Sequence, residues 1–445
     1  IFITTLKLMK ALIKKLIAYD KLYPAIQSSA FYHIFKKAQA QFAAYLHGNP
    51  AKNFFIIGIT GTNGKTTTVN LLHKILNDNL APTVAVSTAC LRIGNQKFAN
   101  LKKMTSLAAS DLQELLSTAK QSGCKVAILE ASSQGLDQHR FEWIDFDAAV
   151  LINITHDHLD YHGTMENYAA SKKLLFKNVL NNRKQVKFWI FPADDAYGRK
   201  RFEEMPFDKK INFSIQASSI LKATQIIEHL DHTEFTFSYL GKLYRWKTHL
   251  LGAYNINNIL AAISVAIEIG IEMEKILASV ESFPGVEGRL EEFTINNKKV
   301  FVDFAHTPDG LEKTLSYLKG QKGNWKLITV FGAPGNRDKE KRPIMWEIAG
   351  KYSDILIATD DDPSTENRLA ILNQLTASLQ EAFYKEGKEL FIMPERAYAI
   401  QLALELANPG DIILIAGKGH EKVQLTNFWK RPRSDQGYLK SLMQN

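Results

Sequence analysis

Residues 54–68 read Phe-Phe-Ile-Ile-Gly-Ile-Thr-Gly-Thr-Asn-Gly-Lys-Thr-Thr-Thr, an apolar run that passes into a glycine-rich loop. Apolar residues then recur at helical spacing over residues 69–79, so the stretch predicts a strand, a loop and a helix. The backbone N–H groups of such a loop point at phosphate oxygens, and the positive end of the helix strengthens the attraction. Lys65 can reach a terminal phosphate, and the Thr66 hydroxyl can bind Mg²⁺. The sequence therefore predicts a nucleoside triphosphate site.

The loop departs from the standard phosphate-binding pattern at one position. That pattern has glycine where this chain has Ile59, and the glycines stand instead at Gly58, Gly61 and Gly64. A glycine-rich turn that binds no ligand is the alternative interpretation. We favour the nucleotide site, because Gly-Lys-Thr lies between a strand and a helix.

The composition is that of a globular chain of 445 residues, for which two or three domains are expected. The net charge of +9 suits nucleic acid, a membrane surface or an anionic substrate. We recognise no nucleic-acid module, so we expect a phosphate-rich small substrate and no nucleic acid. The chain has two cysteines, Cys90 and Cys124, and no apolar run long enough to span a bilayer. A cytoplasmic protein is therefore expected.

Residues 1–50 form a basic segment in which one acid, Asp20, stands against many lysines. The lysines are Lys7, Lys10, Lys14, Lys15, Lys21, Lys36 and Lys37. Leucine and isoleucine alternate with them as in an amphipathic helix. We expect a helical extension packed against the next domain, with its lysines exposed to solvent. A helix lying on an anionic membrane, with contact through residues 1–40, is the alternative.

Residues 51–285 are expected to form a central ATP-binding domain. Residues 126–129 and 148–153 read as buried strands, and Ser110 with Gln113 reads as a capping box that starts the helix before them. A hairpin is expected between about residues 211 and 246, and an apolar helix over residues 257–269. Alternating strands and helices predict a doubly wound parallel sheet.

Residues 286–445 are expected to form a second, Rossmann-like α/β domain. Residues 283–289 contain Pro and Gly without periodicity and read as a hinge between the two domains. The strands expected in the second domain are residues 300–304, 326–331, 355–358 and 412–416.

Polar residues gather where two predicted strands of the central domain end. Glu130 and Ser132 follow one strand, and His156, His158 and His162 follow the next. Ligands collect at the carboxyl ends of strands in parallel sheets, so these groups suggest metal binding beside the triphosphate. Mg²⁺ prefers oxygen ligands, which makes a histidine ligand unusual. Zinc is the competing interpretation, and we rank it lower because no cysteine or His-Glu-x-x-His spacing supports it.

From about Asn53 to the C-terminus the chain resembles the Mur ligase family, and within it most of all the tripeptide-forming branch. Residues 157–164, Asp-His-Leu-Asp-Tyr-His-Gly-Thr, are the most diagnostic motif. The other matching motifs are residues 61–67, 130–133, 136–140, 168–176, 252–258, 288–291, 303–309, 337–338 and 417–421. Each is weak alone, but their order across two domains makes the resemblance specific.

The resemblance implies an ATP- and Mg²⁺-dependent ligase that activates a carboxylate as an acyl phosphate for attack by an amine. Its partners would be a muramoyl-peptide nucleotide and a free amino acid. The implied ATP-binding residues are Gly61, Thr62, Asn63, Gly64, Lys65, Thr66, Thr67, Asn255, Asn258, Arg289, Asp303, His306 and Arg337. The implied substrate-binding residues are Thr105, Ser106, Ser132, Gln138, Arg140, Asp361, Asp362, Glu366, Gly417 and Glu421.

The resemblance also implies the catalytic groups, which are Lys65, Glu130, His158 and Lys172. Thr66, Glu130 and His158 would hold the metal together with Lys172 in carbamylated form. Without the resemblance, Lys172 reads as a solvated lysine on a helix.

Several features depart from the family pattern. The tripeptide-forming enzymes have an N-terminal domain for the uridine diphosphate, and residues 1–50 do not resemble it. We expect that the domain is missing, that the nucleotide is held differently, or that the substrate carries no UDP. Residues 361–364 read Asp-Asp-Pro-Ser where diaminopimelate-selecting enzymes have Asp-Asn-Pro-Arg. The residue at position 134 and the loop 332–338 also differ.

Ser364 cannot make the bidentate contact of an arginine with a carboxylate. The acids around it, Asp360 to Asp362 with Glu366, predict a preference for lysine or a similar basic diamino acid. Arg368 or Arg396 folding in from elsewhere is the alternative clamp.

Two other functions are compatible with parts of the sequence. A folylpolyglutamate- or cyanophycin-type ligase has the same fold, but residues 157–164 and 138–140 argue against it. A non-catalytic ATP-binding scaffold is opposed by the presence of Lys65, Glu130, His158 and Lys172 together.

Overall fold

The computed structural model describes residues 29–102, 104–376, 383, 388–426 and 429–444. Helix α3 (Ala30–Leu46) is capped by Ser29, whose hydroxyl accepts a hydrogen bond from the Tyr32 N–H at 3.2 Å. A short 3₁₀ turn, η1 (Pro50–Asn53), then leads into the central domain. The helical extension expected over residues 1–50 is thus observed for 30–46, while residues 1–28 lie outside the described residues.

Eleven strands form the central sheet in the order β11-β10-β9-β8-β7-β6-β1-β5-β2-β3-β4. The strands from β2 to β9 in this order are parallel, and antiparallel strands extend the sheet at both edges. Their bounds are β1 (Phe55–Thr60), β2 (Thr83–Val86), β3 (Cys90–Ile93), β4 (Gln96–Ala99), β5 (Val126–Glu130), β6 (Ala148–Leu151), β7 (Phe188–Pro192), β8 (Lys210–Ser214), β9 (Leu221–Glu228), β10 (Thr233–Tyr239) and β11 (Lys242–Thr248).

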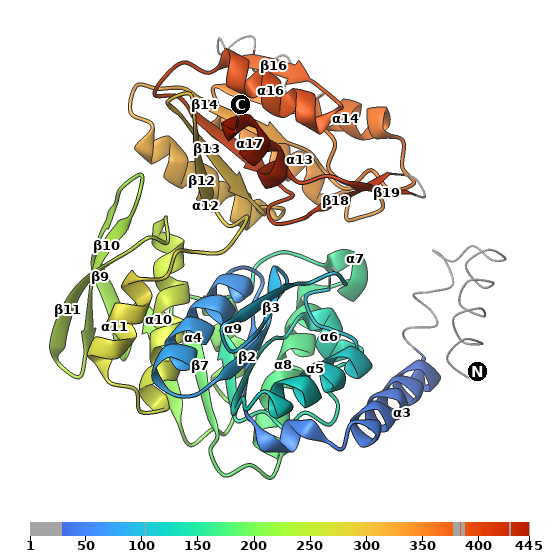
Figure 1. Cartoon of the computed structure of the whole chain (residues 1–445), viewed down its shortest axis with the longest axis vertical. Helices are drawn as coiled ribbons and strands as arrows, with labels where there is room; N and C mark the ends of the chain where they lie inside the picture. The colour runs from blue at the N-terminus through green and yellow to red at the C-terminus, as the bar shows by residue number, and fades with distance from the viewer. Residues whose placement is uncertain (1–28, 103, 377–382, 384–387, 427–428, 445) are drawn as a thin grey trace.

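Helices cover both faces of this sheet, as Figure 1 shows. One face buries α4 (Lys65–Asn79), α10 (Ala253–Glu268) and α11 (Met273–Glu281) around Ile57, Leu72 and Ile259. The other face buries α5 (Ala109–Gln121) and α8 (Met165–Asn181) around Ile56 and Leu116. The remaining helices are α6 (Ser133–Asp137), α7 (Leu159–His162) and α9 (Ala196–Phe202). The expected doubly wound arrangement is confirmed.

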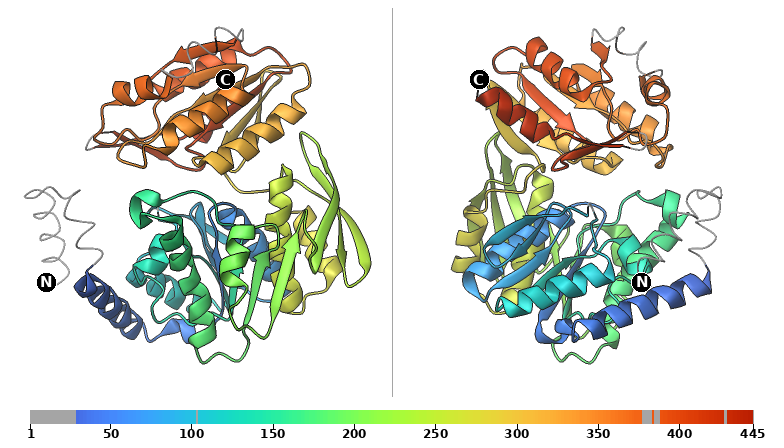
Figure 2. Two further views of the ribbon diagram at one scale, coloured as in Figure 1. Left: turned by 180° about the vertical axis from the view of Figure 1, so that it is seen from behind. Right: turned by 45° about the vertical axis from the view of Figure 1, so that its right-hand side comes forward.

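The second sheet has the order β12-β13-β17-β14-β15-β16, with β12 antiparallel to the rest. It lies above the central domain in both views of Figure 2. Its strands are β12 (Glu291–Ile295), β13 (Lys298–Asp303), β14 (Leu327–Phe331), β15 (Ile355–Ala358), β16 (Glu389–Ile392) and β17 (Ile412–Ala416). Further elements are α12 (Pro308–Gln321), α13 (Lys341–Tyr352), α14 (Arg368–Thr376), α16 (Arg396–Leu406), α17 (Asp435–Met443), β18 (Val423–Thr426) and β19 (Trp429–Pro432).

One local prediction is wrong. Helix α5 begins at Ala109 with Ala108 as its N-cap and no side-chain capping bond, so Ser110 lies inside the helix and makes no capping box with Gln113. The buried strands expected from apolar runs are all present. Where a hairpin was expected, β8 pairs in parallel with β9, and β9, β10 and β11 form an antiparallel meander.

Among the residues that the structure describes, none of the helices combines the length and the apolar character needed to cross a bilayer. Cys90 and Cys124 are buried free thiols.

Candidate active site

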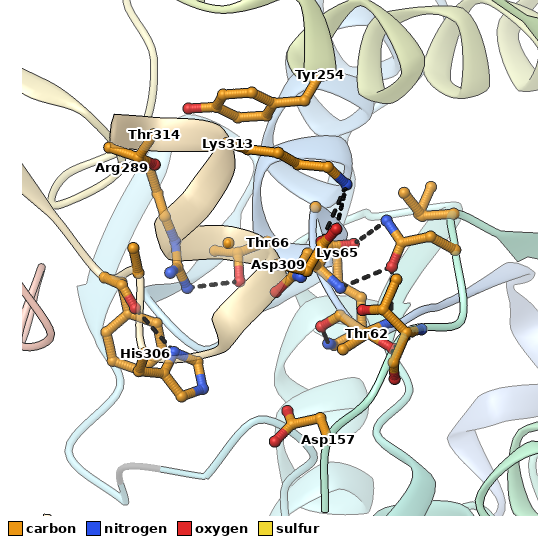
Figure 3. Close-up of a pocket in the computed structure, with 18 of the residues that line it drawn as sticks. Thr62, Lys65, Thr66, Asp157, Tyr254, Arg289, His306, Asp309, Lys313 and Thr314 are labelled. Atoms are coloured by element: carbon orange, nitrogen blue, oxygen red, sulfur yellow. Dashed lines mark hydrogen bonds and ion pairs between the residues drawn. The ribbon is translucent and has the colours of Figure 1, made fainter. Parts of the chain in front are cut away.

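A cleft of about 1210 Å³ lies between the two sheets and takes its lining from both. Strands β6, β1, β5 and β2 are adjacent and parallel, so their carboxyl ends meet at the floor of this cleft. The end of β13 faces them from the second sheet with Asp303 and His306. Figure 3 shows how side chains of the two domains point toward one another there.

The phosphate loop joins β1 to α4 and is held by Asn153, which follows β6. The Asn153 Oδ1 accepts hydrogen bonds from the N–H groups of Thr62 (3.0 Å) and Asn63 (2.9 Å). Gly64 has a φ of 85°, and a Cβ there would stand 2.1 Å from the Asn258 Oδ1 of α10. Glycine is required at this position because the loop turns tightly against that side chain. Gly58, in contrast, lies within β1, where a Cβ would strike the core side chains of Leu175 and Phe146.

Glu130 at the end of β5 gathers hydroxyl groups beside the loop. It accepts hydrogen bonds from Thr66 Oγ1 (3.1 Å), from the Thr88 N–H (2.7 Å) and from Thr88 Oγ1 (3.0 Å). Arg289 Nη2 of the second domain donates to Thr66 Oγ1 at 3.2 Å. Thr66, Thr88 and Glu130 thus present a compact set of oxygen donors, the kind that Mg²⁺ prefers.

Two lysine amines share one acceptor in the loop. Lys65 Nζ donates to the Gly61 carbonyl at 2.9 Å and to Thr62 O at 2.8 Å, and Lys172 Nζ of α8 donates to Gly61 O at 2.8 Å. Burial lowers the pKa of both lysines, and for Lys172, whose exposed fraction is 1%, it falls well below the usual value. Lys172 is therefore no solvated helix lysine, and its burial favours the neutral form of the amine over the charged one.

The diagnostic motif 157–164 lies beside these lysines. His158 has a φ of 56° at the N-terminus of α7, and its Nε2 stands 3.3 Å from Asp157 Oδ2. Its side chain is 38% exposed, and its pKa is lowered by partial burial and by the lysine charges. Burial opposes the Asp157 charge, but His158, Lys341 and His306 lower the Asp157 pKa to about 2. Lys341 Nζ of α13 lies 3.6 Å from Asp157 Oδ1, which links the two domains across the cleft.

The second domain reaches the phosphate loop directly. Asn63 Nδ2 donates to Asp309 Oδ2 at 2.7 Å, and Thr307 Oγ1 donates to Asn63 Oδ1 at 3.3 Å. Asp303 accepts hydrogen bonds from the N–H groups of Leu290 (2.6 Å) and Ala305 (2.8 Å). These bonds fix the residue that follows Arg289 and the residue that precedes His306.

The His306 Nδ1 bonds the Phe304 carbonyl at 2.8 Å, so Nδ1 carries the hydrogen and Nε2 is free to accept. Burial lowers the His306 pKa to about 3. The Arg289 guanidinium lies over the Phe304 ring at 4.3 Å.

The asparagines of α10 form one hydrogen-bonded pair at the cleft. Asn258 Nδ2 donates to Asn255 Oδ1 at 2.7 Å, and Asn255 Nδ2 donates to Leu251 O at 2.7 Å. Both lie in the lining with Thr67 and Tyr254. Arg337, on the loop after β14, is exposed and also lines the cleft.

A second group of predicted residues forms a polar wall on the central domain. Ser106 Oγ lies 2.9 Å from Ser132 Oγ and donates to Glu130 O at 3.0 Å. Arg140 donates to Ser106 O at 2.6 Å and to Gln138 Oε1 at 2.7 Å. Ser132, Arg140 and Thr105 line the cleft, whereas Ser106 and Gln138 lie behind them and hold them in place.

The second domain supplies the opposite wall of the cleft. This wall contains Asp361, Asp362, Gly417 and Glu421. Lys418 Nζ pairs with Asp362 at 2.6 Å, with Asp361 at 3.6 Å and with Glu421 at 2.5 Å. Burial and the neighbouring Asp362 outweigh Lys418 and raise the Asp361 pKa to about 6.

Glu366 lies outside the cleft lining, because it pairs with Arg342 at 2.9 Å and with Lys339 at 3.3 Å. Asp360 is likewise paired with Arg368. Arg396 is buried and bonded to Asp435 at 2.9 Å, so its guanidinium does not reach the cleft.

Four residues escaped the sequence analysis, namely Thr88, Asn153 as loop anchor, Lys341 and Lys418. Asn153 and Thr88 follow strands β6 and β2, so their place after apolar runs was a usable signal. Lys341 and Lys418 gave none, because only the folding of the second domain brings Lys341 to the cleft and Lys418 to the acids that line it.

A phosphate loop beside clustered oxygen donors, faced by a second α/β domain, defines a nucleotide-dependent enzyme of phosphoryl transfer. The model of the Mur ligase middle domain matches residues 59–266, and that of the Mur ligase glutamate ligase domain matches residues 288–419. The chain belongs to the Mur ligase family. It is an ATP- and Mg²⁺-dependent, ADP-forming amide ligase of peptidoglycan precursor synthesis.

Relatives of known name support this assignment. The UDP-N-acetylmuramoyl-L-alanyl-D-glutamate--2,6-diaminopimelate ligase of Synechococcus elongatus is 38% identical over 394 residues, which cover 87% of this chain and 76% of the relative. The UDP-N-acetylmuramyl-tripeptide synthetase of Roseiflexus sp. is 35% identical, with coverage of 86% and 77%. A solved structure of a 2,6-diaminopimelate ligase of this type superposes with a TM-score of 0.62 at 29% identity and covers 92% of this chain and 83% of its own.

Proposed function

We propose that this ligase joins a diamino acid to the D-glutamate of UDP-N-acetylmuramoyl-L-alanyl-D-glutamate. The γ-phosphoryl group of ATP passes to the substrate carboxylate, and the amine of the diamino acid then displaces phosphate from the acyl phosphate. The observation that carries the proposal is a polar wall with Ser132 and Arg140 and an acidic wall with Asp361 and Asp362 that line the same cleft as the phosphate loop. The names of the similar proteins agree with it.

The groups around the loop suit phosphoryl transfer, which needs positioning and charge neutralisation. Lys65 and Arg289 would face the phosphate oxygens, and Asn255 and Asn258 would contact the nucleotide at the start of α10. Thr66, Thr88 and Glu130 would hold Mg²⁺ through their oxygen atoms, with His158 at the edge of the set. The metal supplies positive charge to the triphosphate when it is bound.

We further propose that Lys172 is carbamylated in the active enzyme. Its neutral amine attacks CO₂, an N–C bond forms, a proton leaves, and the product carries a negative charge in place of the cation. The proposal is supported by the strongly lowered Lys172 pKa and by its contact with Gly61 O at 2.8 Å. A carbamate there would add anionic oxygens beside the loop and offset the charge of Lys65.

The acidic wall supports lysine or a similar basic diamino acid as the preferred substrate. Asp360 and Glu366 are matched by arginines and do not contribute. Asp361, Asp362 and Glu421 all pair with Lys418, so the carboxylates of this group outnumber the lysine that they share. An ammonium group on the incoming side chain would be attracted there.

The test is phosphate release from ATP with UDP-N-acetylmuramoyl-L-alanyl-D-glutamate and a panel of amino acids, with the products separated by mass. We expect one tripeptide product for each phosphate released. A parallel reaction with the muramoyl dipeptide without UDP shows whether the uridine diphosphate is recognised. Phosphate release without an amide product, or product formed only from a pteroylglutamate, would contradict the proposal.

We also propose that α3 rests on an anionic membrane surface. The helix packs on α5 through its small residues Ala40, Ala43 and Ala44, while Phe31 (79%) and Tyr45 (74%) are among its large exposed apolar residues. Figure 1 shows this helix at the side of the central domain. Exposed aromatic residues with nearby lysines are typical of helices that lie in a lipid interface.

Sedimentation with vesicles checks this contact. Phe42 is a further exposed aromatic residue of α3. We expect the full chain to bind phosphatidylserine-containing vesicles, and the double variant Phe31→Asp, Phe42→Asp to lose binding. Phe98→Asp on strand β4 is the matched control, since Phe98 is exposed far from α3 in the sequence. Equal binding of all three proteins, or no binding by the full chain, would overturn the proposal.

A further inference from the structure

The loop between β9 and β10 carries titratable residues that the ligase reaction does not use. Residues 229–234 read His-Leu-Asp-His-Thr-Glu, and residues 229–232 form the turn in which the His229 N–H donates to His232 O at 2.9 Å. The strands on either side pair through Glu228 and Thr233. The hairpin therefore brings His229, His232 and Glu234 together at one end of the sheet.

Three possible ligand atoms of this cluster lie close together. Glu234 Oε1 lies 3.6 Å from His232 Nε2 and 3.9 Å from His229 Nε2, and all three atoms lie within 4.8 Å of one another. Around one tetrahedral zinc ion, with bonds near 2.1 Å, neighbouring ligand atoms stand about 3.4 Å apart. The His229 and His232 rings are stacked, with centroids 4.3 Å apart and planes 15° apart, so one ring has to rotate about its side-chain bonds before both Nε2 lone pairs face a single ion.

Second contacts orient two of the ligands. His232 Nδ1 lies 2.9 Å from Asp231 Oδ1, and because a carboxylate only accepts, Nδ1 carries the hydrogen and Nε2 presents its lone pair. Arg245 Nη2 donates to Glu234 Oε2 at 2.9 Å, which leaves Oε1 toward the histidines. A carboxylate bonded to the far nitrogen of a histidine is the usual support of a zinc ligand.

We propose that His229, His232 and Glu234 form a binding site for a divalent transition-metal ion of the zinc class. Two imidazoles and one carboxylate match the ligand preference of Zn²⁺ and Co²⁺, and a water molecule would complete the tetrahedron. Such a set is a poor site for Mg²⁺, because Mg²⁺ prefers oxygen ligands. The histidines are 41% and 28% exposed, so an ion can enter from solvent.

The position of the cluster gives the ion a structural consequence. Leu230 in the same turn packs against the core of the second domain, and Tyr317 OH of α12 donates to His229 O at 2.6 Å. Figure 1 shows the β9–β10 hairpin reaching up beside that domain. Asp309 and Lys313 on the preceding turns of α12 line the active-site cleft. An ion in the turn would stiffen the contact that holds α12 over the cleft.

The test uses the untagged full chain with Co²⁺ in the presence of excess Mg²⁺. We expect visible absorption bands of a tetrahedral cobalt site, one equivalent of Co²⁺ bound, and displacement by Zn²⁺. His232→Asn should lose these bands. Asp231→Asn should weaken Co²⁺ affinity by roughly 10- to 100-fold, because the supporting carboxylate is removed. His249→Asn, a change at an exposed histidine nearby, is the matched control and should bind as the wild type does.

Thermal unfolding gives a second readout, which does not depend on metal binding at the active site. Zn²⁺ should raise the melting temperature of the wild type and of His249→Asn, but not of the double variant His229→Gln, His232→Asn. The melting temperature without metal establishes that the double variant is folded. Equal Co²⁺ spectra and stoichiometry in the wild type and the double variant would overturn the proposal, since the metal would then be bound elsewhere.

Discussion

In the central domain Lys65 and Lys172 donate to the same carbonyl, whereas in the second domain Lys418 and Arg396 lie buried beside carboxylates. Burial opposes the charge of all four groups. Without a carboxylate in contact, the pKa of Lys172 falls well below its usual value. The neighbouring acids raise the pKa of Lys418, and Asp435 raises that of Arg396, despite the same burial.

Under the proposed function, the two walls of the cleft receive different ligands. In the central domain Lys65 and Lys172 donate to backbone carbonyls, and in the proposed reaction arriving phosphates or a carbamate on Lys172 would supply the negative charge. The second domain already pairs its buried cations with carboxylates, and in the proposed reaction its acidic wall would attract a cationic amino acid. Burial lowers the pKa of each of these cations, and where carboxylates are in contact, as at Lys418 and Arg396, their combined effect outweighs burial and raises it.

The largest effect is expected for Lys65→Ala, which removes the loop cation. A charge aimed at the transferring phosphoryl group is worth several kcal/mol in the transition state, so kcat should fall roughly 10²-fold or more. Lys74→Ala is the control, since Lys74 lies on the same helix and pairs with Asp78 on the surface. Phosphate release measures both, with circular dichroism to establish the fold. Near-normal turnover in Lys65→Ala would show that Lys65 does not neutralise the phosphates, and the contrast between the cations of the two domains would then have no functional meaning.

Lys172→Ala tests whether the active enzyme needs a carbamate on the Lys172 amine. Activity should fall roughly 10²-fold and return in part with added short carboxylic acids, because these can restore negative charge at the vacated place. Lys173→Ala, whose neighbouring amine donates to Arg201 O at 2.9 Å, should keep wild-type activity. Full activity in Lys172→Ala would show that the carbamate is not needed.

The comparison of buried titratable groups can be extended to His73, which lies on α4 of the central domain and affects how stability depends on pH. Burial lowers the pKa of His73 from 6.5 to about 4, so the unfolded chain binds the proton more readily between these values. Stability contributed by neutral His73 is present above pH 6.5 and is lost as pH falls toward 4. From pH 7.5 to pH 5 the loss is about 2 kcal/mol.

Urea unfolding of His73→Gln should show a loss over that pH range smaller by about this amount. The exposed His249→Gln should show the wild-type loss. An unchanged pH dependence in His73→Gln would contradict a lowered His73 pKa in the folded chain.

The smallest effect is expected for Ser364→Arg on the acidic wall. A guanidinium can bond the distal carboxylate of diaminopimelate, and such a charged hydrogen bond is worth about 1.5 kcal/mol or more. The ratio of products in a competition between lysine and diaminopimelate should therefore shift roughly 10-fold toward diaminopimelate. Ser364→Gln, of similar reach but without charge, is the control. If diaminopimelate already dominates in the wild type, the argument from the missing arginine is wrong.

Sequence patterns of short range were sufficient for much of the fold. Apolar runs marked the buried strands β1, β5, β6, β14, β15 and β17, because strands of a parallel sheet are covered on both faces. They did not mark β12, β16, β18 and β19, which lie at sheet edges or on the surface and whose residues are less apolar. The capping box at Ser110 was misplaced, since the same residues also fit the first turn of the helix.

The sequence by itself determined the phosphate loop and the order of motifs, because both depend on residues close together in the chain. Only the tertiary structure decided that Lys172 is buried against Gly61, that Lys418 pairs with Asp361 and Asp362, and that Glu366 turns away to Arg342. Each of these outcomes depends on contacts between residues far apart in the sequence. The energy of a charged group is set by those contacts and by the water they exclude, and neither can be read from the residue alone.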